Sequence, residues 1–130
     1  MRVGLLISLL TVVVLAAGCS SHRNSAHPAA AGAVISLKSL MFNPADLTIK
    51  VGTTVTWRND EPITHTVTSG AVAGIDKTSH LRSSQTPDGL FNAQLKGNGD
   101  TFSYTFAKPG TYSYYCDIHQ GMNATVTVTS

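Results

Sequence analysis

Apolar and polar side chains alternate along several short stretches of the chain after residue 32, and this period of two restricts the fold more than any other feature. The clearest stretches are 35–38, 47–50, 54–58, 102–106 and 125–129. Successive side chains of a β-strand point to opposite faces, so such alternation is typical of strands with one buried face. Turn sequences such as Asn43-Pro44, Val51-Gly52 and Pro109-Gly110 separate the stretches. No helical pattern of comparable length interrupts them, and we therefore predict an all-β fold, a small antiparallel sandwich.

The predicted core consists of the apolar members of these stretches together with Trp57, Phe91 and the tyrosines. The apolar members are Ile35, Leu37, Leu47, Ile49, Val55, Phe102, Tyr104, Phe106, Val126 and Val128. Residues 69–88 break the alternation, so we expect a long surface excursion there, with His80 as a solvated histidine. The adjacent carboxylates Asp60 and Glu61 have no acid–base partner nearby in the sequence, and we assign them to a turn.

The N-terminal segment has the features of an export signal. Arg2 precedes an apolar run over residues 3–17, which ends in the small residues Ala16-Ala17-Gly18 before Cys19. This junction resembles a bacterial lipobox, which implies that residues 1–18 are a lipoprotein signal peptide and that Cys19 is lipidated. The alternative is an uncleaved membrane anchor, although the run is short against the roughly 20 residues that span a bilayer. We expect an extracytoplasmic protein of the bacterial cell envelope, anchored to the membrane by lipid.

Residues 19–32 are small and polar without periodicity, which predicts a flexible linker in which His22 and His27 are solvated. Residues 33–130 then form one domain. Arg2 and Arg23 lie before this domain. The domain therefore contains seven of the nine Lys and Arg residues and all seven Asp and Glu residues. This balanced charge, without a basic stripe, argues against nucleic acid as a partner.

A cysteine, a histidine and a methionine lie within seven residues near the C-terminus, at Cys116, His119 and Met122, and His65 lies upstream. Two imidazoles, one thiolate and a weak thioether are the donor set of blue copper sites. Zinc also binds Cys and His, but methionine is a poor fourth ligand for it. A Cys19–Cys116 disulfide is the structural alternative in an exported chain. Against it, Cys19 stands where lipidation would modify its sulfur.

The predicted strands can bring these residues together. His65 follows the stretch 54–58, and Cys116 ends the strand predicted over 111–115. If the two strands carrying them are neighbours, both side chains meet at one end of the sandwich. The loop 117–121 then carries His119 and Met122 to the same point. A plane of His65, Cys116 and His119 with a distant Met122 lies between the preferences of Cu(I) and Cu(II), which suits electron transfer.

Several sequence elements of the domain match a known family. They are Phe42-Asn43-Pro44, Val51-Gly52-Thr53-Thr54-Val55-Thr56-Trp57-Arg58-Asn59, His65, Lys108-Pro109-Gly110-Thr111-Tyr112 and the segment 116–122. Together they resemble the cupredoxins, specifically the plastocyanin and amicyanin branch. The resemblance implies a Greek-key β-sandwich with one type 1 copper ion bound by His65, Cys116, His119 and Met122. The spacing Cys-x2-His-x2-Met is that of the short amicyanin loop, whereas Thr66 and Ile118 stand where the family usually has asparagine and often proline.

The resemblance implies a monomeric one-electron carrier that meets its redox partner proteins transiently. A copper-handling protein that binds the metal without shuttling electrons is the alternative function. We do not expect an enzyme, because copper oxidases and nitrite reductases need a second copper centre and the chain has no His-x-His pair or further histidine cluster.

Overall fold

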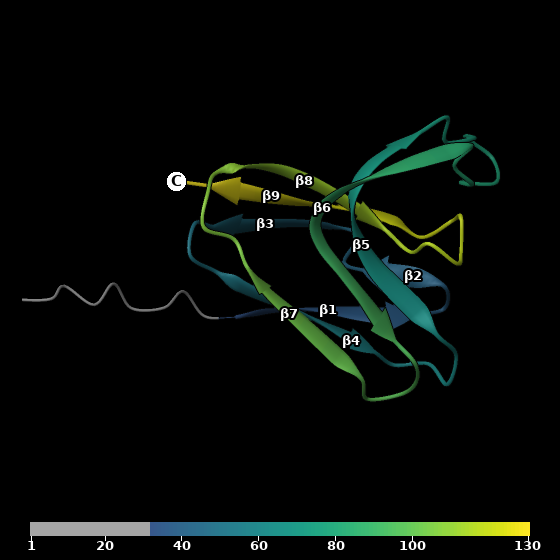
Figure 1. Cartoon of the computed structure of the whole chain (residues 1–130), viewed down its shortest axis with the longest axis horizontal. Helices are drawn as coiled ribbons and strands as arrows, with labels where there is room; N and C mark the ends of the chain where they lie inside the picture. The colour runs from purple at the N-terminus through teal and green to yellow at the C-terminus, as the bar shows by residue number, and fades with distance from the viewer. Residues whose placement is uncertain (1–31) are drawn as a thin grey trace, which may run out of the picture.

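The computed structural model describes residues 32–130, which form a β-sandwich (Figure 1). Its strands are β1 (Ala33–Lys38), β2 (Met41–Asn43), β3 (Asp46–Lys50), β4 (Thr54–Asn59), β5 (His65–Ala73), β6 (Ser84–Leu95), β7 (Thr101–Thr105), β8 (Gly110–Tyr115) and β9 (Asn123–Thr129). Within this described part of the chain, no helix has the length and apolar character to cross a membrane. The predicted signal peptide, Cys19 and the linker up to residue 31 lie outside the described residues.

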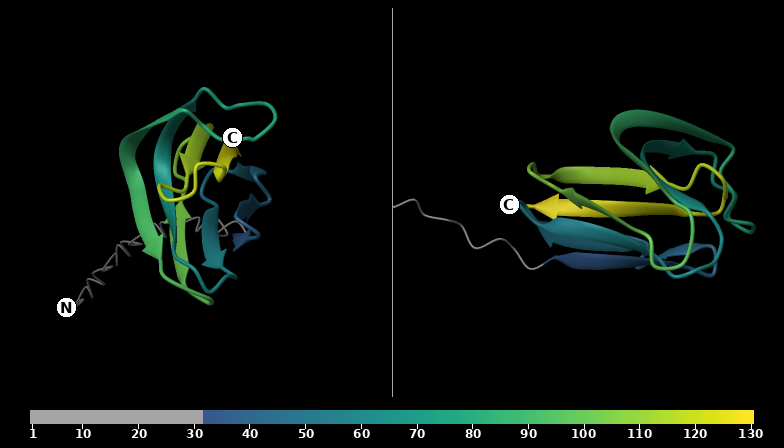
Figure 2. Two further views of the ribbon diagram at one scale, coloured as in Figure 1. Left: turned by 90° about the vertical axis from the view of Figure 1, so that its right-hand side faces the viewer. Right: turned by 60° about the horizontal axis from the view of Figure 1, so that its bottom comes forward.

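The strands form two sheets that face each other (Figure 2). One sheet has the order β2-β1-β4-β7 and the other β3-β9-β8-β5-β6, so the predicted all-β sandwich is confirmed. Most neighbouring strands are antiparallel, but β1 pairs with β4, and β3 with β9, in parallel. In the first case the chain visits the other sheet, through β3, before it returns beside β1. Alternation of apolar and polar residues shows which side of a strand is buried but not its direction, which is why the sequence did not indicate these two pairs.

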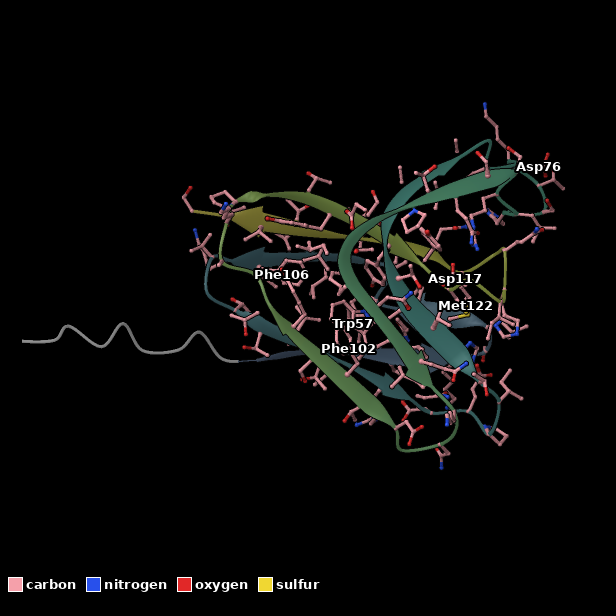
Figure 3. The ribbon with its side chains drawn as sticks, viewed as in Figure 1. Trp57, Asp76, Phe102, Phe106, Asp117 and Met122 are labelled. Carbon is pink, nitrogen blue, oxygen red and sulfur yellow. The ribbon has the colours of Figure 1, made fainter. Side chains whose placement is uncertain are left out.

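The predicted core residues lie between the sheets. Ile35, Leu37, Ile49, Val55, Trp57, Phe91, Phe106, Val126 and Val128 are buried, and Leu47, Phe102 and Tyr104 pack against them. Trp57 is fully buried, with its ring centroid 5.4 Å from those of Phe91 and Tyr114 and 5.6 Å from that of Phe102. Figure 3 shows Trp57, Phe102 and Phe106 in the middle of the sandwich. Burial of these large side chains is the main favourable contribution to folding, and it ties the two sheets together.

The long surface excursion predicted over residues 69–88 is wrong in its extent. β5 continues to Ala73 and β6 begins at Ser84, so only residues 74–83 connect the two strands. Beyond Ser69, β5 no longer pairs with β8, and it continues with β6 as a two-stranded projection (Figure 1). Most side chains of the projection are exposed. Because these ends of β5 and β6 have no consistently buried face, their apolar and polar residues do not alternate. The sequence pattern therefore could not predict them.

Gly70 allows the bend at the base of this projection. The pairing of β5 with β6 shifts register between Thr68 and Gly70, and Gly70 has a φ of 145°. A Cβ atom on Gly70 would lie 2.2 Å from the main-chain oxygen of Thr86 on β6. Only glycine fits here without movement of the backbone.

Gly70→Ala is therefore expected to lower the free energy of unfolding by about 2–5 kcal/mol, because backbone strain and a backbone clash act together. Urea denaturation of the protein without added metal measures the change. Gly97→Ala is the matched control, since a Cβ atom there meets nothing within 4 Å; it should change stability by less than about 0.5 kcal/mol. Equal urea midpoints of unfolding for the two variants would contradict this explanation of the bend.

Candidate metal centre

The predicted metal ligands meet because β5 and β8 are neighbours in one sheet. The two strands run antiparallel, with Thr68 opposite Tyr115 and Ser69 opposite Tyr114. His65 is the first residue of β5, and Cys116 comes directly after the last residue of β8. Both therefore stand at the same end of the sandwich, as the sequence analysis expected.

Three donor atoms converge at this end. The Sγ atom of Cys116 lies 4.0 Å from Nδ1 of His65 and 3.6 Å from Nδ1 of His119, and all three donors lie within 4.8 Å of one another. With the bond lengths that zinc shows to the same donors, about 2.0 Å to nitrogen and 2.3 Å to sulfur, a trigonal site separates nitrogen from sulfur by about 3.7 Å. The cluster therefore has the dimensions of a site for one metal ion.

Met122 closes the loop that carries these donors. Its amide donates a hydrogen bond to the carbonyl of His119 at 3.0 Å, and its carbonyl accepts one from the amide of Cys116 at 3.1 Å. Its side chain is buried in the same core cluster as Cys116, and Figure 3 shows it at the same end of the sandwich as Asp117. The structure thus brings the donor atoms of His65, Cys116 and His119 together and places Met122 at the end of the same loop. His80 is exposed in the connection 74–83 and is not part of the cluster.

His65 is fully buried, and Glu61 holds its outer nitrogen. Oε2 of Glu61 lies 2.8 Å from Nε2 of His65, and its carboxylate also accepts hydrogen bonds from the amides of Ser39 and Leu40. Burial alone would raise the pKa of this carboxyl, but these hydrogen bonds lower it below its usual value, so Glu61 is an anion. It therefore places the ring proton on Nε2 and leaves the lone pair of Nδ1 free to face Cys116.

Assigning Glu61 only to a turn was therefore incomplete. Its carboxylate does hold the turn between β1 and β2, where Ser39 and Leu40 have φ values of 57° and 56°. The same carboxylate also orients a metal ligand. The signal in the sequence was its position four residues before His65, but only the folded loop shows that the two side chains meet.

The sulfur of Cys116 accepts a hydrogen bond from the main chain of β5. The amide of Thr66 donates to Sγ at 3.3 Å, and Oγ1 of Thr66 accepts from the amide of Asp117 at 2.7 Å. Thr66 is one of the two departures that the sequence analysis found from the family it resembles. The bond to sulfur nevertheless comes from the backbone, and the link to the ligand loop comes from a hydroxyl. With threonine at position 66, the sulfur of Cys116 still accepts a hydrogen bond.

His119 reaches the cluster from the loop and is only partly buried. Burial lowers the pKa of His119 below its usual value, and the neighbouring ring of His65 lowers it further. A lowered pKa favours the neutral imidazole, which is the form that binds a metal. Its partial exposure makes His119 the ligand nearest to the protein surface.

Comparison with known proteins agrees with this donor set. A family model described as copper binding proteins, plastocyanin/azurin family, matches residues 29–129. Plastocyanin of Scenedesmus fuscus is 33% identical over 93 residues, which cover 69% of this chain and 88% of that protein. Amicyanin of Paracoccus denitrificans is 33% identical over 99 residues, covering 73% of this chain and 63% of the amicyanin. The chain spans about half the length of chloroplastic plastocyanins such as that of Oryza sativa, where the match covers 54%.

Solved structures show the same fold. A purple cupredoxin from Nitrosopumilus maritimus superposes with a TM-score of 0.58 at 32% identity, over 75% of this chain and 99% of that one. The Cu(I) form of an amicyanin variant superposes with a TM-score of 0.53 at 32% identity, over 75% and 82% of the two chains. Sequence and structure agree that the chain belongs to the plastocyanin/azurin family of copper-binding proteins.

Proposed function

We propose that this protein is a one-electron carrier in which His65, Cys116 and His119 would hold one type 1 copper ion and Met122 would bind it weakly. The observation that carries the proposal is the convergence of two imidazole Nδ1 atoms on one buried cysteine sulfur. Bound copper would supply the redox chemistry by alternating between Cu(II) and Cu(I). The relatives named amicyanin and plastocyanin support this choice over an enzyme.

The protein would support electron transfer by holding the metal-binding atoms in fixed positions. His65 is held between Glu61 and the cysteine sulfur, and the sulfur itself is held by the amide of Thr66. The ends of the ligand loop are tied by the hydrogen bonds between Cys116, His119 and Met122. Donors that do not move when the metal changes charge keep the reorganisation energy small, and this supports rapid transfer.

The surface beside His119 suits a brief encounter with a redox partner. Exposed apolar side chains lie close to it, and Leu40, Leu81 and Ile118 line a hollow that His119 also borders. Met41 is exposed and borders a second hollow with Leu40. Redox complexes bury a small area, below about 1,200 Å², so this modest patch is enough. We propose that electrons enter and leave through His119.

For the location, we propose a lipid-anchored protein of the bacterial cell envelope. The support is the apolar run over 3–17 followed by Ala16-Ala17-Gly18-Cys19. The linker predicted over residues 19–32 would leave the copper domain free to meet partners near the membrane.

Cys116→Ser should abolish the intense thiolate-to-copper absorption of the Cu(II) protein and leave the sandwich folded. Serine lacks the soft sulfur donor on which the blue colour depends. Absorption spectroscopy and voltammetry with added Cu(II) measure the effect, and circular dichroism checks the fold. The unmodified protein should be blue with a reversible one-electron wave, which also separates a carrier from a protein that only stores copper. A serine variant that stays blue would remove the site assignment.

Substitution of Met122 should move the reduction potential in two directions. Met122→Leu removes a soft axial donor and should raise it, whereas Met122→Gln offers an oxygen that favours Cu(II) and should lower it. Met41→Leu is the control, because Met41 is exposed on β2 and its loss should leave the potential unchanged. If the potential is the same in all of these proteins, Met122 is not a ligand.

Cys19→Ser should remove the membrane anchor. We expect the natural protein to partition into detergent with acyl chains on Cys19, and the variant to keep its signal peptide or be released without lipid. Mass spectrometry of the mature N-terminus gives the answer, and Cys116→Ser should leave it unchanged. Cleavage elsewhere, without acyl chains on Cys19, would refute the lipoprotein assignment.

A further inference from the structure

Arg82 lies in the connection 74–83, a part of the chain that the sequence presented as polar surface. Its side chain is nevertheless buried, with only 3% of the residue exposed. The guanidinium lies over the ring of Tyr115, 4.8 Å from its centroid. A buried cation is costly unless its N–H groups find acceptors, so the partners of Arg82 show what the residue does.

Those partners belong mainly to the loop that carries the copper ligands. The guanidinium donates to five acceptors: the carbonyls of Cys116 (2.6 Å), Gln120 (3.0 Å) and His119 (3.3 Å), Oδ1 of Asn123 (3.0 Å) and Oε1 of Gln85. The main-chain amide of Arg82 also donates to the carbonyl of Gln120 at 3.3 Å. One planar cation thus holds both ends of the segment 116–120, including the backbone of two proposed ligands.

A carboxylate of the ligand loop itself, that of Asp117, is linked to the same cation. The amide group of Gln85 accepts from Arg82 and donates to Oδ1 of Asp117 at 2.9 Å. Oδ2 of Asp117 accepts in turn from the hydroxyl of Thr68 on β5 at 2.7 Å. Arg82, Gln85 and Asp117 therefore form a chain of hydrogen bonds that ties the loop to β5 and β6.

We propose that Arg82 is a positioning residue that holds the ligand loop in its copper-ready conformation before the metal binds. Within residues 116–122, the backbone hydrogen bonds join Cys116 with Met122 and Met122 with His119. Arg82 adds hydrogen bonds to the carbonyls of Cys116, His119 and Gln120, and the bond to Cys116 is buried. Without the guanidinium, the buried carbonyl of Cys116 loses its donor, and the carbonyls of His119 and Gln120 each lose one of their donors. The loop then has to open towards water to supply the carbonyl of Cys116 with a new donor.

The charge of Arg82 has a second consequence, which rests on the proposed function. The cation lies next to Cys116, and the reduced copper site carries one positive charge less than the oxidised site. A buried positive charge therefore favours the reduced form. Removing it should lower the reduction potential, whereas a lysine that keeps the charge should leave the potential nearer to its original value. Lysine cannot reproduce the planar fork, so it should not restore the positioning of the loop.

Amide hydrogen exchange of the copper-free protein, followed by NMR, tests the positioning role directly. In the unmodified protein the amides of Cys116 and Met122 should be protected. Arg82→Met should speed their exchange by about tenfold or more, while the paired amides of β8 and β9 keep their rates. Arg58→Met is the matched control, because the exposed guanidinium of Arg58 bonds only to Asp60. It should leave the loop amides unchanged.

A folded Arg82→Met protein with unchanged loop protection would overturn the proposal. So would fast exchange of Cys116 and Met122 in the unmodified copper-free protein, a result that needs no variant to fold. If Arg82→Met does not fold, Arg82→Lys must show the faster loop exchange, and normal protection there would also overturn it.

Copper affinity is the second measurement. Arg82→Met should bind copper about 10–100-fold more weakly than the unmodified protein, as is usual when a residue that supports metal ligands is removed. The exchange experiment uses no copper. A protein that fails to turn blue would therefore reject the proposed function without touching the role of Arg82, and unchanged exchange would reject that role while the blue site stands.

Discussion

The short pairing between β5 and β8 determines the arrangement of the metal end of this molecule. Two residue pairs, Thr68 with Tyr115 and Ser69 with Tyr114, set the register, and from it His65 and Cys116 come to the same edge. The amide of Thr66 then reaches the cysteine sulfur. A slip of one residue would turn every side chain of a strand to the opposite face and take its apolar side chains out of the core. The core around Trp57 therefore fixes the register, and with it both the geometry of the site and the stability of the fold.

Each buried polar group of the site is held by a partner of complementary character. Glu61 accepts a hydrogen bond from the ring of His65, Thr66 supplies a donor to the sulfur, and Arg82 supplies donors to the carbonyls of the loop. Such partners are what make the burial of a thiolate and an imidazole tolerable in a protein interior. The three partners come from different parts of the chain: the loop before β5, β5 itself and the connection before β6. Three of the four proposed ligands, Cys116, His119 and Met122, are local in the sequence, but the support of the site is distributed over the fold.

This distribution explains what the sequence could and could not predict. Strands packed against the core show alternation, so the sequence predicted the burial of Ile35, Val55 and Val126. The Cys-x2-His-x2-Met spacing, together with His65, indicated the candidate ligands. The projecting ends of β5 and β6 have no uniformly buried face and gave no pattern. Arg82 and Glu61 look like ordinary surface charges, because their roles depend on contacts with residues 34 positions away in one case and on a folded loop in the other. Strand direction in the two parallel pairs was likewise not encoded in the pattern.

The central claim is that the fold, and not the metal, sets the positions of the donors. Crystal structures of the domain without copper, with Cu(I) and with Cu(II) test it most directly. The account predicts that the donor atoms of His65, Cys116 and His119 keep their positions within about 0.5 Å in all three states, which is the tolerance expected of a preorganised site. A ligand loop that refolds when copper binds, or a His65 ring that turns away from Cys116 in the metal-free protein, would contradict it.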